Sequence, residues 1–95
     1  MEIDMEERYN HIRTLISEEK LEQAMKEIEE IIKMDSSQDQ AYYLKGNVFR
    51  KQQDWKNAIN SYTHAVELNP NSPAADARVM CIEILNFFNT DMYNH

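Results

Sequence analysis

The sequence predicts an all-α fold, and three observations support this prediction. A single glycine and two prolines in 95 residues leave few positions at which a helix must end. Much of the remaining chain consists of Leu, Ile, Ala, Met, Glu, Lys and Gln, which favour helices. The pattern of apolar and aromatic residues also repeats after 34 residues. Together these features indicate antiparallel helical hairpins that stack into a short solenoid.

Polar breaks divide the chain into five predicted helices. The breaks lie at residues 17–20, 35–39, 52–54 and 69–73, and the helices are expected at about 4–17, 20–34, 39–52, 54–68 and 73–88. Asp4 and Glu7 have the spacing of a capping box, and so do Ser37 and Gln40. Ser72 precedes a proline that suits the first position of the last helix. The last seven residues show no clear periodicity, so no element is assigned to them.

A shift of 34 residues superposes apolar or aromatic side chains along the chain. The superposed pairs are Tyr9 and Tyr43, Leu15 and Phe49, Leu21 and Trp55, Ala24 and Ala58, Met25 and Ile59, Ile28 and Tyr62, Ile31 and Ala65, and Ile32 and Val66. A two-helix hairpin cannot bury its apolar face alone, so this period indicates hairpins that stack on one another.

The second period, Asp39 to Ser72, resembles the tetratricopeptide repeat. The matching positions are Tyr42, Lys45, Gly46 and Phe49 for the pattern W-x-x-L-G-x-x-Y, Ala58 and Tyr62 for A-x-x-x-F, and Pro70 for the closing proline. The resemblance implies that the two helices of a repeat cross at close range, where small residues leave room for large ones. Because glycine costs about 1 kcal/mol relative to alanine in a helix interior, packing explains Gly46 better than chance does.

The resemblance also implies one domain, residues 1–95, with one continuous core. Its units are a degenerate repeat at 5–38, a well-matched repeat at 39–72, a capping helix at 73–88 and a tail at 89–95. Atypical terminal units are expected because their outer faces meet solvent instead of another repeat. The expected core residues are Leu15, Leu21, Ala24, Ile28, Phe49, Trp55, Ala58, Ile59 and Tyr62.

Composition excludes several classes of function. Ten basic and 17 acidic residues give a net charge of −7, which disfavours binding to nucleic acid or to anionic membranes. No apolar run approaches the roughly 20 residues of a membrane span, and the N-terminus does not resemble a signal peptide. A single cysteine cannot form an internal disulfide. A cytoplasmic location is therefore expected.

The sequence offers little for catalysis. His11, His64 and His95 are scattered and lack the spacing of a zinc site. Cys81 lies in an apolar helix, where a small buried hydrophobe is expected instead of a nucleophile. One glycine cannot build a phosphate-binding loop, and the glutamates of the second helix fit a solvated face. No catalytic residue, metal or cofactor is expected, so an enzyme or nucleotide binder is the least favoured of three hypotheses.

The leading hypothesis is a non-enzymatic adaptor or scaffold. In tetratricopeptide proteins the first helix of each repeat builds the inner face of the array, and the resemblance implies that this groove holds a peptide or a partner helix. The candidate contact residues, here called the predicted binding surface, are Tyr9, Arg13, Ser17, Tyr43, Asn47, Arg50, Lys51, Arg78 and Cys81. Four of them are basic, so the expected ligand carries acidic residues beside an apolar or aromatic anchor. The alternative is that each is an ordinary solvated side chain.

One subclass of the family fits poorly. Chaperone-binding members hold a C-terminal carboxylate with a lysine and asparagine clamp. Asn47 matches the asparagine, but Tyr43 stands where the lysine is expected. A cochaperone role is therefore not favoured.

Self-association through the last helix is the second hypothesis. On a helical wheel Val79 and Ile82 suit packing on the preceding hairpin, and the residues that extend around the other side are Met80, Ile84, Phe87 and Phe88. An exposed apolar patch of this kind favours a homodimer, or insertion into a neighbour's groove. The tail or a further repeat could instead cover the patch.

Overall fold

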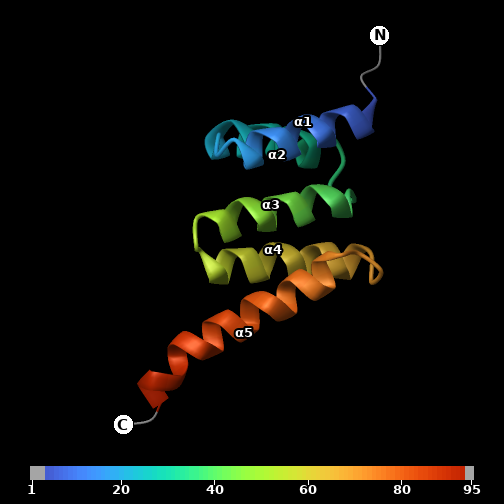
Figure 1. The fold of residues 1–95 in the computed structure, drawn as a ribbon. Helices are drawn as coiled ribbons and strands as arrows, with labels where there is room; N and C mark the ends of the chain where they lie inside the picture. The colour runs from blue at the N-terminus through green and yellow to red at the C-terminus, as the bar shows by residue number, and fades with distance from the viewer. Residues whose placement is uncertain (1–3, 94–95) are drawn as a thin grey trace.

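The computed structural model describes residues 4–93, and side chains from residue 4 to residue 88; within this range the chain forms five α-helices and no strand. The helices are α1 (Met5–Ser17), α2 (Leu21–Met34), α3 (Asp39–Lys51), α4 (Trp55–Leu68) and α5 (Ala74–Tyr93). Two antiparallel hairpins, α1–α2 and α3–α4, stack on each other, and α5 lies diagonally against α4 (Figure 1). The predicted all-α class is confirmed.

Two of the three predicted N-terminal caps are present. Asp4 caps α1 by accepting a hydrogen bond from the Glu6 N–H at 3.1 Å, and Ser72 Oγ accepts one from the Ala74 N–H at 3.1 Å. The prediction for Ser37 is wrong. Its hydroxyl donates to the Asp35 carboxylate at 2.6 Å, because this closer charged acceptor competes successfully for it.

Asp35 organises the connection between the two hairpins. The Ser37 hydroxyl, the Gln38 side-chain amide and the Ser37 N–H all donate to its carboxylate, and they lower its pKa to about 2. The loop is thus fixed by one carboxylate, and α3 begins at Asp39 without a side-chain cap.

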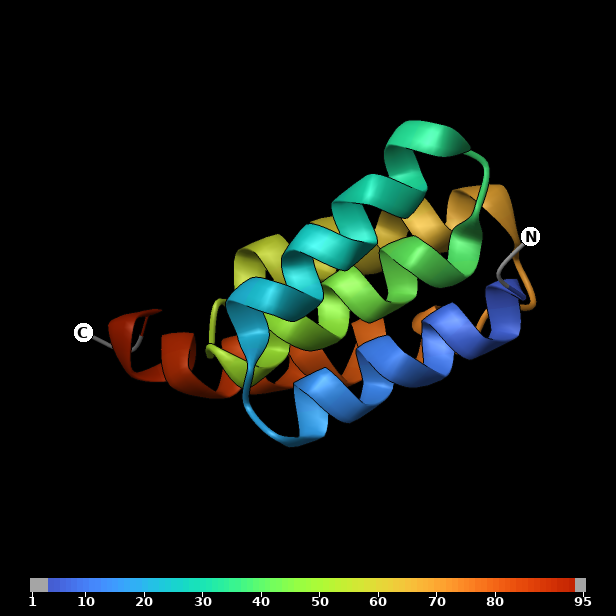
Figure 2. The same cartoon turned by 90° about the horizontal axis from the view of Figure 1, so that it is seen from above.

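Helix α5 is longer than the sequence indicated. It continues to Tyr93, so residues 89–93 of the predicted tail are helical, and the remainder, including His95, lies outside the described residues. Its C-terminal end runs past the α3–α4 hairpin (Figures 1 and 2), and the molecule is elongated, with principal extents of 60 × 28 × 18 Å.

The turns inside the two hairpins have the same geometry. Glu19 and Gln53, which are 34 residues apart, both adopt a left-handed conformation with φ of 61° and 60°. In each turn the next residue donates its N–H to the carbonyl four residues before the left-handed position, Lys20 to Leu15 at 2.8 Å and Asp54 to Phe49 at 2.9 Å. This is a Schellman-type C-cap, and its recurrence supports the 34-residue period.

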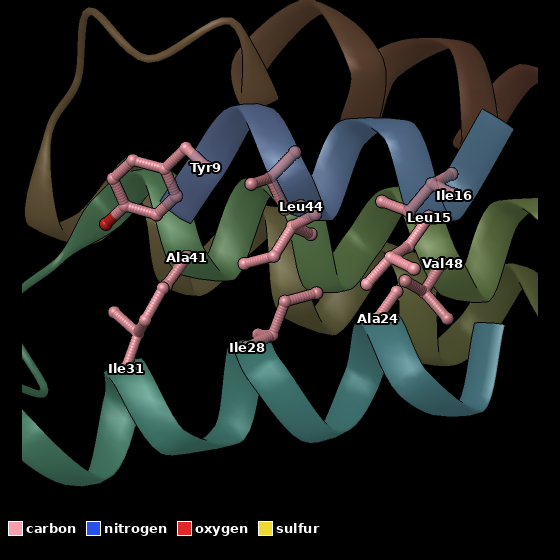
Figure 3. Packing of buried hydrophobic residues seen from close by; sticks show 10 residues of the cluster. Tyr9, Leu15, Ile16, Ala24, Ile28, Ile31, Ala41, Leu44 and Val48 are labelled. Carbon is pink, nitrogen blue, oxygen red and sulfur yellow. The ribbon is translucent and has the colours of Figure 1, made fainter. Parts of the chain in front are cut away.

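The hydrophobic interior consists of two clusters instead of the single continuous core that was expected. The first lies between α1, α2 and α3 (Figure 3) and contains Tyr9, Ile12, Leu15, Ile16, Ala24, Ile28, Ile31, Ala41, Leu44 and Val48. The second lies between α3, α4 and α5 and contains Tyr42, Ala58, Tyr62, Ala65, Ala74, Ala77 and Cys81. Ile32 and Tyr43 pack against both clusters and join them. Four predicted core residues, Leu21, Phe49, Trp55 and Ile59, are only partly buried at the edges.

Gly46 is required by the close crossing of α3 and α4. A Cβ atom at this position would overlap the Cε1, Cδ1 and Cζ atoms of the fully buried Tyr62 ring. Ala58 is also fully buried at this crossing. The close approach inferred from the repeat pattern is therefore present.

The orientation of α5 about its own axis differs from the prediction. Its buried stripe consists of Ala74, Ala77 and Cys81, and small side chains at this spacing allow α5 to approach α4 closely. Val79 and Ile82, which were expected to pack on the hairpin, are 50% and 39% exposed because they lie off this stripe.

Candidate partner-binding surface

The first hairpin contributes less to the predicted binding surface than expected, because Tyr9 is buried. Its hydroxyl donates to Gln38 Oε1 at 2.9 Å, and burial, reinforced by the charges of Asp39 and Asp35, raises its pKa. Tyr9 therefore supports the fold and offers little contact area, contrary to the expectation. Arg13 and Ser17 remain exposed on α1.

Helix α3 supplies the four central candidates. Tyr43 is partly exposed, and its ring centroid lies 5.9 Å from that of Tyr62. Asn47 Oδ1 accepts a hydrogen bond from the Tyr62 hydroxyl at 2.5 Å, so Asn47 is held by the interior. Arg50 is partly exposed and Lys51 is fully on the surface.

The positive charge of Arg50 affects the pKa of two buried groups. Burial raises the pKa of the Tyr62 hydroxyl and of the Cys81 thiol, and the nearby guanidinium of Arg50 opposes both shifts. Cys81 is fully buried, as expected for a small hydrophobe, so it cannot be an exposed partner contact. Arg78 turns toward α4, where its guanidinium donates to Thr63 Oγ1 at 3.4 Å.

Residues of α1 and α3 line a hollow of about 230 Å³ at the predicted binding surface. Its lining residues are Arg13, Asp39, Gln40, Tyr43, Ser72 and Pro73. Arg13 and Tyr43 were predicted contacts, and the other four were missed. Gln40 lies one helical turn before Tyr43, so helical spacing could have identified it. The loop residues Ser72 and Pro73 reach the hollow only through the tertiary fold.

The basic side chains differ in how they are neutralised. On α1 and in the first turn, ion pairs join Arg8 to Glu30, Arg13 to Glu6 and Lys20 to Glu18, at 3.2–3.8 Å. Among the described residues, the basic side chains of the predicted binding surface that have no carboxylate within ion-pair distance are Arg50, Lys51 and Arg78. Within the predicted binding surface, the unneutralised positive charge therefore lies on α3 and α5.

A larger hollow of about 630 Å³ lies on another side of the molecule, between α2 and α3. Leu21, Met25 and Phe49 form its apolar part. An ion pair of 2.9 Å between Lys45 and Glu29 bridges the two helices at its edge. The sequence analysis did not identify this hollow.

The described residues hold no cluster of three or more His, Cys, Asp or Glu side chains that could bind a metal ion. Within residues 4–93, no helix combines the length and the apolar content that a membrane span requires.

Comparison with known proteins agrees with the stacked hairpins. The family model of the tetratricopeptide repeat matches residues 40–72, the hairpin of α3 and α4. The chain is also similar to Bacteroides fragilis protein BF1650, whose solution NMR structure superposes with a TM-score of 0.82. The two are 47% identical, over 90% of this chain and 88% of the other. This chain belongs to the tetratricopeptide repeat family.

Tetratricopeptide repeats generally mediate interactions between proteins. The family model covers the repeat that was predicted at 39–72. No match was found among curated proteins.

Proposed function

We propose that this tetratricopeptide protein is a non-catalytic adaptor or scaffold that binds a peptide or a helix of a partner protein. Two observations on the predicted binding surface carry the proposal. Among the described residues, its basic side chains without a carboxylate in ion-pair distance are Arg50, Lys51 and Arg78, and its Arg13 and Tyr43 line a hollow. The contacts proposed are Arg13, Ser17, Tyr43, Arg50 and Lys51, with Arg78 at the edge. The cytoplasmic location expected from the sequence is part of this proposal.

The chemistry of these residues defines the proposed ligand. Positive charge on a protein of net charge −7 favours a segment rich in Asp or Glu, and the partly exposed Tyr43 favours an apolar or aromatic anchor beside it. Each exposed charge pair contributes about 0.2–1 kcal/mol, so micromolar affinity that weakens with added salt is expected. The apolar contact supplies the remainder of the binding free energy.

The test uses peptides selected from a random 12-residue library on the immobilised protein, followed by fluorescence anisotropy. Selected peptides are expected to be enriched in Asp or Glu next to an aromatic or aliphatic residue. The double variant Arg50→Glu, Lys51→Glu should weaken their binding by at least about twofold to thirtyfold, which corresponds to losing two exposed pairs. Tyr43→Ala should mainly accelerate dissociation.

The matched control is Lys26→Glu, Lys33→Glu, which makes the same change in net charge on exposed positions of α2. It should leave the affinity within about twofold, because α2 is outside the predicted binding surface. An equal loss in both double variants would indicate a general charge effect. Unchanged affinity in the Arg50, Lys51 variant would exclude this surface.

Exposure of Phe87 and Phe88 on α5 favours a second candidate function, self-association. An enzyme or nucleotide binder is the third candidate, and no feature of the described residues favours it. Screening by thermal shift with nucleotides and divalent metals is the check on that candidate. A large, reproducible rise in melting temperature with a nucleotide or a metal would favour this third candidate over the adaptor proposal.

A further inference from the structure

The second half of α5 is apolar on more than one side. The stripe that packs on α4 through Ala77 and Cys81 continues beyond the hairpin to Phe88, which is 61% exposed. Around the rest of the helix, Phe87 is 75% exposed and Met80 is 53% exposed. A helix that is apolar all round is usually buried in a functional assembly.

The exposed apolar area is large enough to form the centre of an interface. From Val79 to Phe88 the only charged residue is Glu83. Taking about 200 Å² for a phenylalanine side chain, the two exposed rings alone leave roughly 270 Å² of apolar surface in water. Contiguous apolar patches of a few hundred Å² mark interaction sites on soluble proteins. A stable interface buries about 800 Å² on each partner, so the patch can form its centre.

The opposite end of the molecule could not cover this patch. There an ion pair of 3.8 Å joins Arg8 of α1 to Glu30 of α2, and His11 Nε2 lies 4.0 Å from a carboxylate oxygen of Glu27. A hollow of about 370 Å³ at this end is lined entirely by charged side chains and His11. Placing apolar rings there would remove charges from water without compensation, so head-to-tail stacking of copies is disfavoured.

We infer that two copies of this chain associate tail to tail, through the apolar side chains of α5 centred on Met80, Phe87 and Phe88. This arrangement buries the same patch on both copies, as a closed two-fold interface requires. Glu83 then lies at the rim, in contact with water.

The distribution of charge supports a second copy as the occupant. Residues 1–38 carry 11 acidic and 5 basic side chains, a net charge of −6, whereas residues 39–95 carry 6 and 5, a net charge of −1. Tail-to-tail association places the acidic hairpins at the two far ends of the pair. Since one copy is 60 Å long and charge interactions are screened within about 8–10 Å, the acidic ends do not oppose the contact.

The dimer would give the adaptor two binding surfaces, and this consequence rests on the proposed function. Tyr43, Arg50 and Lys51 lie on α3, whereas Met80, Phe87 and Phe88 lie on α5. Two accessible surfaces on one particle would bind a partner with two acidic segments more tightly than a single surface does.

Sedimentation equilibrium of the whole chain between 1 and about 100 μM is the test. The expected result is a reversible dimer, twice the 11.3 kDa of one chain, with a dissociation constant in the micromolar range. Phe87→Glu should weaken dimerisation by at least about thirtyfold, the effect of removing a central interface side chain. Because Phe87 is 75% exposed, the variant should keep the circular dichroism spectrum of the parent, and it should keep the melting temperature that the parent has at concentrations below its dissociation constant.

Met34→Glu is the matched control, since Met34 is an exposed apolar residue of α2, 64% exposed, outside the patch. It should dimerise like the parent. A strict monomer at 100 μM would overturn the inference and leave the patch to another protein or a further repeat. Particles that grow beyond the dimer would indicate head-to-tail contacts, and a dimer that survives Phe87→Glu would exclude this patch.

The inference and the proposed function fail separately. If monomeric Phe87→Glu still binds the selected acidic peptides with the affinity of the parent, peptide binding stands whatever the oligomeric state. If the parent dimerises but binds none of the peptides, tail-to-tail association stands and the adaptor proposal does not.

Discussion

The two hairpins pack their helices with different pairs of side chains, and α3 and α4 approach each other more closely than α1 and α2 do. In the second hairpin Gly46 lies under the ring of Tyr62, and the equivalent positions of the first hairpin hold Ile12 and Ile28. Both isoleucines are fully buried in one cluster. The second hairpin thus pairs a glycine with a tyrosine, and the first pairs two isoleucines across helices that lie farther apart.

This difference also affects the surface. The Tyr62 hydroxyl needs an acceptor when it is buried, and Asn47 provides it at 2.5 Å. Isoleucine at position 28 has no such requirement, and the residue equivalent to Asn47 is Arg13. Its guanidinium lines the hollow beside Tyr43. The interior of each hairpin therefore determines whether this surface position is bonded to a buried side chain, as Asn47 is, or to neighbours on its own helix, as Arg13 is to Asn10 and Glu6.

The largest expected effect on stability comes from placing the isoleucine pair of the first hairpin at positions 46 and 62 of the second. Tyr62→Ile should lose about 2–4 kcal/mol of unfolding free energy because it leaves a cavity above Gly46. Gly46→Ile should lose about 1–3 kcal/mol or more through overlap with the ring. The double variant should be more stable than either single variant by at least about 1 kcal/mol, as measured by urea unfolding.

The reciprocal pair tests the first hairpin in the same way. Ile12→Gly removes a buried side chain and lowers helix propensity, and a second change, Ile28→Tyr, should restore part of the lost stability. If the double variant of each hairpin loses the sum of the unfolding free energies lost by its single variants, the side chains at the two positions do not contact each other.

Where the hairpins agree, the same substitution should have the same effect. Ala24 and Ala58 are equivalent and fully buried, so Ala24→Leu and Ala58→Leu should each lower the unfolding free energy by about 1–3 kcal/mol. Lys56→Leu, at an exposed position of α4, is the control and should change it by less than about 0.5 kcal/mol. A change of a few tenths at either alanine would mean that the helices are not close there.

The tyrosine of the second hairpin predicts a difference at alkaline pH. Burial raises the pKa of Tyr62 above its ordinary value of 10.0, so its contribution to stability is complete below pH 10 and is lost as the pH rises further. Tyr62→Phe should lose about 1 kcal/mol at pH 7, through the missing hydrogen bond to Asn47. Above pH 10 the gap between parent and variant should narrow in chemical unfolding experiments. A constant gap up to pH 11.5 would contradict a raised pKa at Tyr62.

Sequence reasoning succeeded where a local pattern repeats. The polar breaks located α1 to α4 within one residue at each end, and Gly46 in the repeat pattern indicated the close crossing of α3 and α4. It failed for α5 in two ways. Val79 and Ile82 were expected to pack on the hairpin because they are large and apolar, but the small residues Ala74, Ala77 and Cys81 pack there instead. Residues 89–93 are also helical, although their sequence shows no periodic pattern.

The binding surface shows the same limit. Helical spacing grouped Tyr43, Arg50 and Lys51 on α3, but it could not show that Tyr9 and Cys81 are buried, because their neighbours come from other helices. Nor could it show that Arg13 is paired with Glu6 while Arg50 is not. Periodicity within one helix identifies a face, and only the packing of several helices determines which face meets solvent.

The smallest expected effect concerns the turns, in which the two hairpins are alike. Glu19 and Gln53 hold a left-handed conformation that costs a residue with a Cβ atom roughly 1–2 kcal/mol, whereas glycine adopts it freely. Glycine also loses more freedom on folding, by about 0.5–1 kcal/mol relative to alanine, which offsets part of this gain. Glu19→Gly and Gln53→Gly should therefore each stabilise the protein, by a few tenths to about 1 kcal/mol.

Thermal unfolding measures this effect, since 1 kcal/mol shifts the melting temperature of a domain of this size by about 4–8 °C. Gln53→Ala is the control. It keeps a Cβ atom in the left-handed conformation and should not raise the melting temperature. Because the two turns share φ and hydrogen bonds, similar gains are expected from both glycine variants. A gain at Gln53 without one at Glu19 would show that the side chain of Glu19 stabilises its turn in a way that Gln53 does not.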